Sequence, residues 1–137
     1  MDSSKIDPEW PNSLRWFLCQ GLNKFTPWHF VDEPSEHENI ARIFKGEDRQ
    51  HRNIFVFANR QDRDGFAGLL IVDGKITSKV VCFHPTFASA ESILSSSYGW
   101  NIVIAEFEDV FDFVAKIVVP DMKDWALMKT QNIYRSA

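Results

Sequence analysis

Histidine and cysteine side chains are the first candidates for catalysis or metal binding in this sequence. Its four histidines are His29, His37, His51 and His84. The shortest spacing between two metal-ligand types is Cys82-x-His84, and residues two apart on a strand share one face. No second pair lies nearby, so a buried cysteine and a histidine at a strand end explain these residues better than zinc. We therefore expect no metal ion and no cofactor.

A carboxylate pair in the middle of the chain is the next candidate. Asp62 and Asp64 flank Arg63 in a polar segment that ends at Gly65. Paired carboxylates can transfer protons or hold a cation. Aspartate and glycine are also favoured in turns for local hydrogen bonding and backbone freedom, and this is the commoner reason for such a pattern. We expect recognition rather than catalysis at this loop.

Nucleophilic catalysis has no local signature in the sequence. The chain contains neither a Gly-x-Ser-x-Gly elbow nor a glycine-rich phosphate loop. A Ser–His or Cys–His arrangement stays open, since such partners meet only in the folded structure. No residue is singled out as catalytic.

Charge is distributed unevenly along the chain, whose formal net charge is -4. A negative balance argues against nucleic-acid and anionic-membrane partners. The segregation of charge could steer a basic partner, but ordinary solvated helix faces explain it equally well and are the preferred interpretation. The acidic residues gather in two groups: Asp32, Glu33, Glu36 and Glu38, and Glu106, Glu108, Asp109 and Asp112.

Length and composition favour one aromatic-rich globular domain. The chain has 137 residues, 14% of them aromatic, which suffices for a core without a disulfide or metal. The two cysteines, Cys19 and Cys82, show no paired spacing, and the start of the sequence lacks the pattern of a signal peptide. No apolar run approaches the roughly 18 residues of a spanning helix. We expect a soluble, cytoplasmic protein.

Apolar spacing predicts both helices and strands. Helices are expected over Ser13 to Gln20, Pro34 to Lys45, Glu106 to a stop at Pro120, and Asp121 to Lys129, where Trp125 and Met128 would dock on the core. Strands are expected over Phe25 to Val31 (an edge strand or extended segment), Asn53 to Ala58, Phe66 to Val72, Lys75 to Phe83 and Trp100 to Ala105. Asp73-Gly74 predicts a hairpin turn, and Thr86 to Tyr98 reads as either loop or frayed helix. The expected fold is a single α+β domain, an antiparallel β-meander of about four to six strands packed against a few helices.

The order of short motifs resembles the SUKH superfamily, which joins fungal cell-wall regulators to bacterial immunity proteins. The resemblance spans roughly Leu14 to Val118. It rests on Pro27-Trp28-His29-Phe30-Val31, Phe55-Val56-Phe57-Ala58, Asp64-Gly65-Phe66, Asp73-Gly74-Lys75-Ile76, Val80-Val81-Cys82-Phe83-His84 and Phe107-Glu108-Asp109-Val110-Phe111-Asp112-Phe113.

This resemblance implies a non-enzymatic domain that binds protein. Many bacterial members look like immunity proteins that neutralise a cognate toxin, often a nuclease, by covering its surface. The alternatives are a small metal-dependent hydrolase using Cys82, His84 and the Asp62/Asp64 pair, or a regulatory scaffold of the same fold. The sequence specifies no oligomeric state. The residues expected to bind the partner are Trp28, Asp62, Asp64, Gly65, Glu108 and Asp109.

Overall fold

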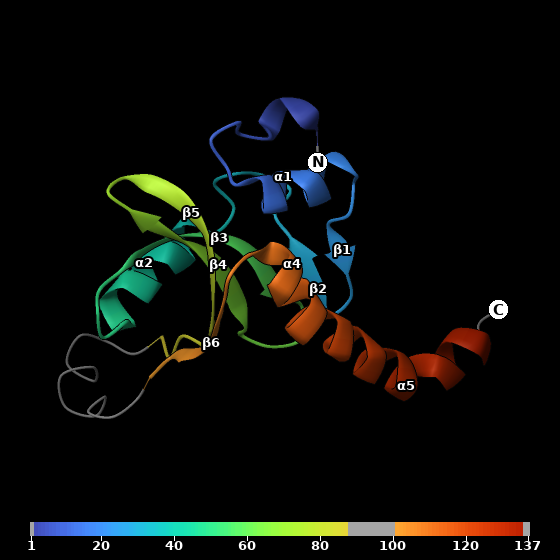
Figure 1. Cartoon of the computed structure of the whole chain (residues 1–137). Coiled ribbons are helices and arrows are strands. Elements are labelled where there is room, and N and C mark those ends of the chain that lie inside the picture. Colours follow the sequence, from blue (N-terminus) through green and yellow to red (C-terminus); the bar gives the residue numbers. More distant parts are fainter. Residues whose placement is uncertain (1, 88–100, 136–137) are drawn as a thin grey trace.

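The computed structural model describes residues 2–87 and 101–135 (Figure 1). Its helical elements are η1 (Ser3–Lys5), α1 (Asn12–Cys19), α2 (Glu38–Glu47), α4 (Val110–Phe113), the π-helical turn η2 (Val114–Val118) and α5 (Val119–Arg135). Its strands are β1 (Lys24–Phe25), β2 (Trp28–Phe30), β3 (Asn53–Arg60), β4 (Phe66–Val72), β5 (Lys75–Phe83) and β6 (Val103–Phe107).

The six strands form one antiparallel sheet in chain order, from β1 to β6. This meander with flanking helices confirms the predicted α+β domain. The hairpin turn between β4 and β5 is also confirmed, because Asp73 and Gly74 have φ values of 52° and 75°. Two consecutive residues with positive φ give a turn whose twist matches that of the strands.

Helices cover both faces of the sheet. Helix α2 lies on one face, where Phe44 packs with Ile54, Val56 and Phe83. Helix α1 and the run from α4 to α5 lie on the other face, as Figure 1 shows. The larger core is on this second face, and its fully buried rings and aliphatic side chains include Leu14, Trp28, Phe57, Leu69, Val80 and Phe113.

A β-bulge in β3 changes which face its side chains point to. The register passes from Val56 opposite Gly68 to Ala58 opposite Ala67, so Phe57 is the extra residue. Before the bulge, Val56 faces α2; after it, Ala58 belongs to the opposite core with Phe57. One extra residue reverses the alternation of a strand. As a result, the end of β3 points toward α5.

The second helix begins later than its sequence pattern predicts. Helix α2 starts at Glu38, whereas the sequence placed Pro34 in its first turn. The preceding segment is held as turns by local bonds: the Asp32 N–H donates to Glu36 at 3.0 Å, and the Asn23 amide donates to Asp32 at 2.7 Å. Side-chain hydrogen bonds of this kind compete with helix formation.

Pro120 does not end the helix that it was expected to end. The chain continues from α4 through η2 into α5, and the Val119 N–H donates to the Val114 carbonyl in an i to i−5 bond. A proline clashes with a regular helix because it lacks an N–H and its ring crowds the preceding turn. The wider π turn accommodates Pro120, so one continuous helical run passes β2 and reaches Arg135, as Figure 1 shows.

The strand expected over Trp100 to Ala105 is present but shifted, since β6 covers Val103–Phe107. Most of the Thr86 to Tyr98 segment, and Trp100, lie outside the described residues. Within residues 2–87 and 101–135, no helix has the length and apolar character needed to cross a bilayer.

Candidate functional site

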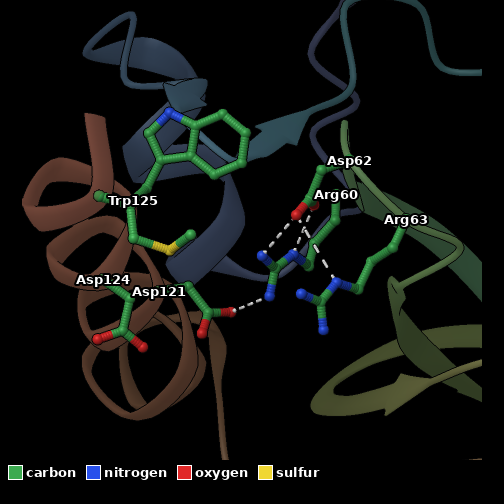
Figure 2. A pocket seen from close by; sticks show the side chains of 7 residues that line it. Arg60, Asp62, Arg63, Asp121, Asp124 and Trp125 are labelled. Carbon is green, nitrogen blue, oxygen red and sulfur yellow. Dashed lines mark hydrogen bonds and ion pairs between the residues drawn. The ribbon is translucent and has the colours of Figure 1, made fainter. Parts of the chain in front are cut away.

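Arg60 is the centre of a charged network between the sheet and α5 (Figure 2). Its guanidinium group pairs with both oxygens of Asp62, at 2.9 Å from Nε and 3.0 Å from Nη2. Its Nη1 lies 3.0 Å from Asp121 Oδ2. The Arg60 side chain is only 13% exposed, so these charge-assisted bonds hold it in one orientation.

Asp121 joins this network to the core of the sheet. The Trp28 indole N–H donates to Asp121 Oδ2 at 2.8 Å, so one carboxylate oxygen accepts from both Trp28 and Arg60. Trp28 and Arg60 are direct neighbours across β2 and β3, and both point toward α5. The β3 bulge makes this possible, because regular alternation would have turned Arg60 toward α2.

A hollow of about 470 Å³ lies beside this network, between the β3–β4 loop and α5. The strand end and loop supply Arg60, Asp62 and Arg63, and α5 supplies the rest of its lining, which is Asp121, Asp124, Trp125 and Met128. The four α5 residues occupy positions i, i+3, i+4 and i+7, which is one face of a helix.

The hollow carries a net negative charge, because three carboxylates and two guanidinium groups line it. Burial raises the pKa of Asp62, but its hydrogen bond to Arg60 and the charges of Arg60 and Arg63 outweigh this and hold the pKa below its ordinary value. Asp62 is therefore ionised at neutral pH. Arg63, which is 60% exposed, lies 3.7 Å from Asp62 at the rim.

The Cys82 thiol is buried beneath the charged network. Burial raises the pKa of Cys82 to about 12, with a further rise from the negative charge of Asp121 that Arg60 partly offsets. The group is protonated at neutral pH, whereas a nucleophile or metal ligand must be a thiolate. His84 is exposed, and its Nδ1 lies 2.7 Å from the Asp64 carbonyl oxygen. Among the described residues, no three His, Cys, Asp or Glu side chains gather as a metal site.

The expected partner-binding residues do not all lie together. Asp62 is in the network, and Asp64 is exposed on the same loop. Trp28, expected among the partner-binding residues, is 2% exposed; it lies beneath the network and donates a hydrogen bond to Asp121. Gly65 is also buried, and a Cβ there would meet His84 Cε1 at 3.2 Å.

Glu108 and Asp109 belong to a different part of the molecule. Asp109 caps α4, since its carboxylate accepts from the Asp112 N–H at 2.8 Å. Asp121 follows twelve residues later along the same helical run, which corresponds to about 18 Å. The structure therefore separates these two acidic residues from the hollow.

Helix α5 supplies four side chains of the hollow that the sequence analysis did not place at a site. Asp121 and Asp124 were not singled out, and Trp125 and Met128 were expected to dock on the core. Met128 is instead 78% exposed and the adjacent Leu127 70% exposed. The signal that could have found this face is the i, i+3, i+4, i+7 spacing of two carboxylates with two large apolar side chains.

Comparisons with known proteins identify no relative: no family model, curated protein or solved structure matches the chain.

Proposed function

We propose that this chain is a non-enzymatic protein-binding domain of the immunity type, which neutralises a cognate toxin by binding and covering it. This is the function implied by the resemblance of its motifs to the SUKH superfamily. The proposed binding surface consists of the β3–β4 loop and the adjacent face of α5.

The observation that carries the proposal is the fixed polar network beside exposed apolar side chains at this surface. Arg60 holds Asp62 and Asp121 in place through three bonds of 2.9 to 3.0 Å. On the adjacent face of α5, Met128 is 78% exposed, and Trp125 lines the hollow beside it. Accessible apolar side chains beside polar groups that are already ordered suit a protein interface, since little further ordering is required when the partner binds.

The charge of the surface favours a basic partner. The net charge of the chain is -4, and the hollow is negative as well. Opposite charges accelerate encounter and exclude partners with the same sign. A nuclease toxin fits this requirement, because it needs a basic surface for nucleic acid and would lose access to that substrate when covered.

Co-expression tests this function. Cells that produce the toxin encoded beside this gene should resume growth when the full chain is expressed with it, and purified toxin and chain should form a stoichiometric complex. The variant Asp64→Lys/Asp124→Lys, which reverses two exposed charges at the surface, should rescue growth less well. Glu38→Lys, on α2 at the opposite face of the sheet, is the control.

Failure of rescue, with no complex between the chain and the neighbouring gene product, would contradict the immunity function. A stable complex with a protein that is not toxic would instead identify a regulatory scaffold, the alternative function of this fold.

A further inference from the structure

We propose that the hollow between the β3–β4 loop and α5 receives a basic side chain, an arginine, that the protein partner presents. This inference rests on the proposed protein-binding function and specifies the chemistry of the partner at that surface. It follows from the net charge of the hollow, from the carboxylate oxygens of Asp121 and Asp124, and from the aromatic and apolar side chains that line α5.

Charge balance selects a cation. Arg60 is already matched by two carboxylates, Asp62 and Asp121. Arg63 lies near Asp62 at the exposed rim, so the two guanidinium groups offset Asp62 and Asp121. Asp124 is exposed on the helical wall of the hollow and adds the unbalanced negative charge. An incoming cation would neutralise this charge, whereas an anion would add to it.

The acceptors that remain suit a guanidinium group. Both hydrogen bonds that Asp121 receives from Trp28 and Arg60 end on Oδ2, so neither uses Oδ1. Asp121 and Asp124 are three residues apart on α5, which places them on the same helix face (Figure 2). A planar guanidinium has five N–H donors and can bridge two neighbouring carboxylates, whereas an ammonium is a compact point charge.

The remaining wall suits the rest of an arginine side chain. Trp125 and Met128 line the hollow on the side of α5, as the next members of the same helix face. Arginine carries a three-carbon stem that packs on apolar surface, and its guanidinium stacks on aromatic rings, tryptophan being the best of them. The hollow, at about 470 Å³, has room for one such side chain.

Titration with capped amino acids tests this inference on the full chain without the partner. The probe is Nα-acetyl-L-arginine amide, and the matched compounds are the corresponding citrulline, lysine and glutamate amides. The readout is the set of five tryptophan indole N–H signals in ¹H–¹⁵N spectra, assigned by single Trp→Phe variants. The arginine probe should move the Trp125 signal, and also the Trp28 signal, because Trp28 bonds to Asp121.

Two variants locate the binding. Asp124→Asn should weaken the arginine probe about threefold to fivefold, the change expected when one partly exposed ion pair is lost. Asp73→Asn, at the β4–β5 turn, makes the same change of charge away from the hollow and should leave binding unchanged. Equal shifts with citrulline, stronger shifts with glutamate, or no effect of Asp124→Asn would each overturn the proposal.

These outcomes are distinct from a failure of the proposed function. If the arginine probe does not bind but the toxin complex forms and weakens with charge reversal at the surface, the arginine pocket is wrong and the function stands. If the probe binds as described but no protein partner exists, the pocket stands and the function fails.

Discussion

The Trp28 indole nitrogen donates a 2.8 Å hydrogen bond to the Asp121 carboxylate, across 93 positions of the sequence. Trp28 is buried on β2, the second strand of the sheet, and its ring packs edge-on against Phe113 at 5.2 Å. The bond therefore ties the first turn of α5 to β2. Because Asp121 also pairs with Arg60, the position of α5 and the orientation of the charged network depend on the same contact.

Removing the Trp28 N–H donor should weaken the attachment of α5 to β2. Trp28→Phe keeps an aromatic ring but removes the N–H, and we expect a loss of about 1–3 kcal/mol in the free energy of unfolding, as for a lost hydrogen bond to a charged group. Urea denaturation measures it through the midpoint, with the m-value unchanged. In an Asp121→Ala background the same substitution should cost clearly less. Equal costs in both backgrounds would assign the effect to ring volume alone.

A second prediction concerns the ion pair between Asp48 and Arg52, in the connection from α2 to β3. The Asp48 side chain is 2% exposed, and Arg52 donates to its two oxygens at 2.9 and 3.2 Å. Burial raises the pKa of Asp48, but the Arg52 hydrogen bonds and charge outweigh it and hold the pKa below its ordinary value. Arg52→Met should cost about 1–3 kcal/mol at neutral pH, because the buried carboxylate loses the guanidinium and keeps the backbone N–H of residue 52 as a donor.

The sign of the pH dependence follows from this lowered pKa. The stability that Asp48 contributes is complete above its unfolded pKa of about 3.9 and is lost as pH falls through the lower folded value. The difference between native protein and Arg52→Met should therefore shrink as the solution is acidified, in urea titrations across the acidic range. Arg42→Met, an exposed control on α2, should change stability by less than about 0.5 kcal/mol. A difference independent of pH would contradict the role of the pair.

A third prediction concerns the contact between Gly68 on β4 and Ile54 on β3. A Cβ on Gly68 would lie 2.8 Å from Ile54 Cδ1 and 3.1 Å from its Cβ. Gly68→Ala should cost about 1–3 kcal/mol through overpacking, measured by urea denaturation. Ile54→Val removes the nearest atom, so the double variant should lose less than the sum of the single losses. Gly65→Ala is the contrast, because its nearest neighbour, the exposed His84, can move aside. A larger loss at Gly65 than at Gly68 would contradict this packing.

Local patterns predicted the hairpin and the order of strands, but the face of a strand depended on tertiary structure. The Asp73-Gly74 dipeptide predicts its hairpin turn from the local sequence alone, because few other residues accept positive φ. The apolar run from Ile54 to Ala58 gives no sign of the bulge at Phe57, because every residue in it suits a buried strand. That single extra residue determines that Arg60 faces α5.

The residues of the candidate site were predicted only in part, because some of them meet only in the folded structure. Asp62 and Asp64 were recognised from their loop, which is a local feature. Asp121 lies 61 positions from Arg60, and no spacing rule connects them. Pro120 also suggested a helix end just before it, whereas the π turn carries the helix past it and brings Asp121 to the network.

A fourth prediction concerns association with the proposed toxin. Asp64→Lys/Asp124→Lys should slow association, mainly at low salt, because it reverses the charge that attracts a basic partner. Stopped-flow mixing at two ionic strengths measures the rate. Glu108→Lys reverses one charge near the start of α4, away from the hollow, and should have a smaller effect than Asp124→Lys alone, which makes the same change of charge at the hollow. If Glu108→Lys slows association more, the partner binds near α4 instead.

Site-specific photo-cross-linking tests the proposed binding surface most directly. A photoreactive amino acid replaces Met128 on α5 or, as control, Val72 at the β4–β5 end of the sheet; both positions are exposed, at 78% and 54%. In a complex with the proposed toxin, cross-linking is expected from position 128 and not from position 72. Cross-linking from position 72 alone, or equally from both, would contradict a surface formed by the β3–β4 loop and α5.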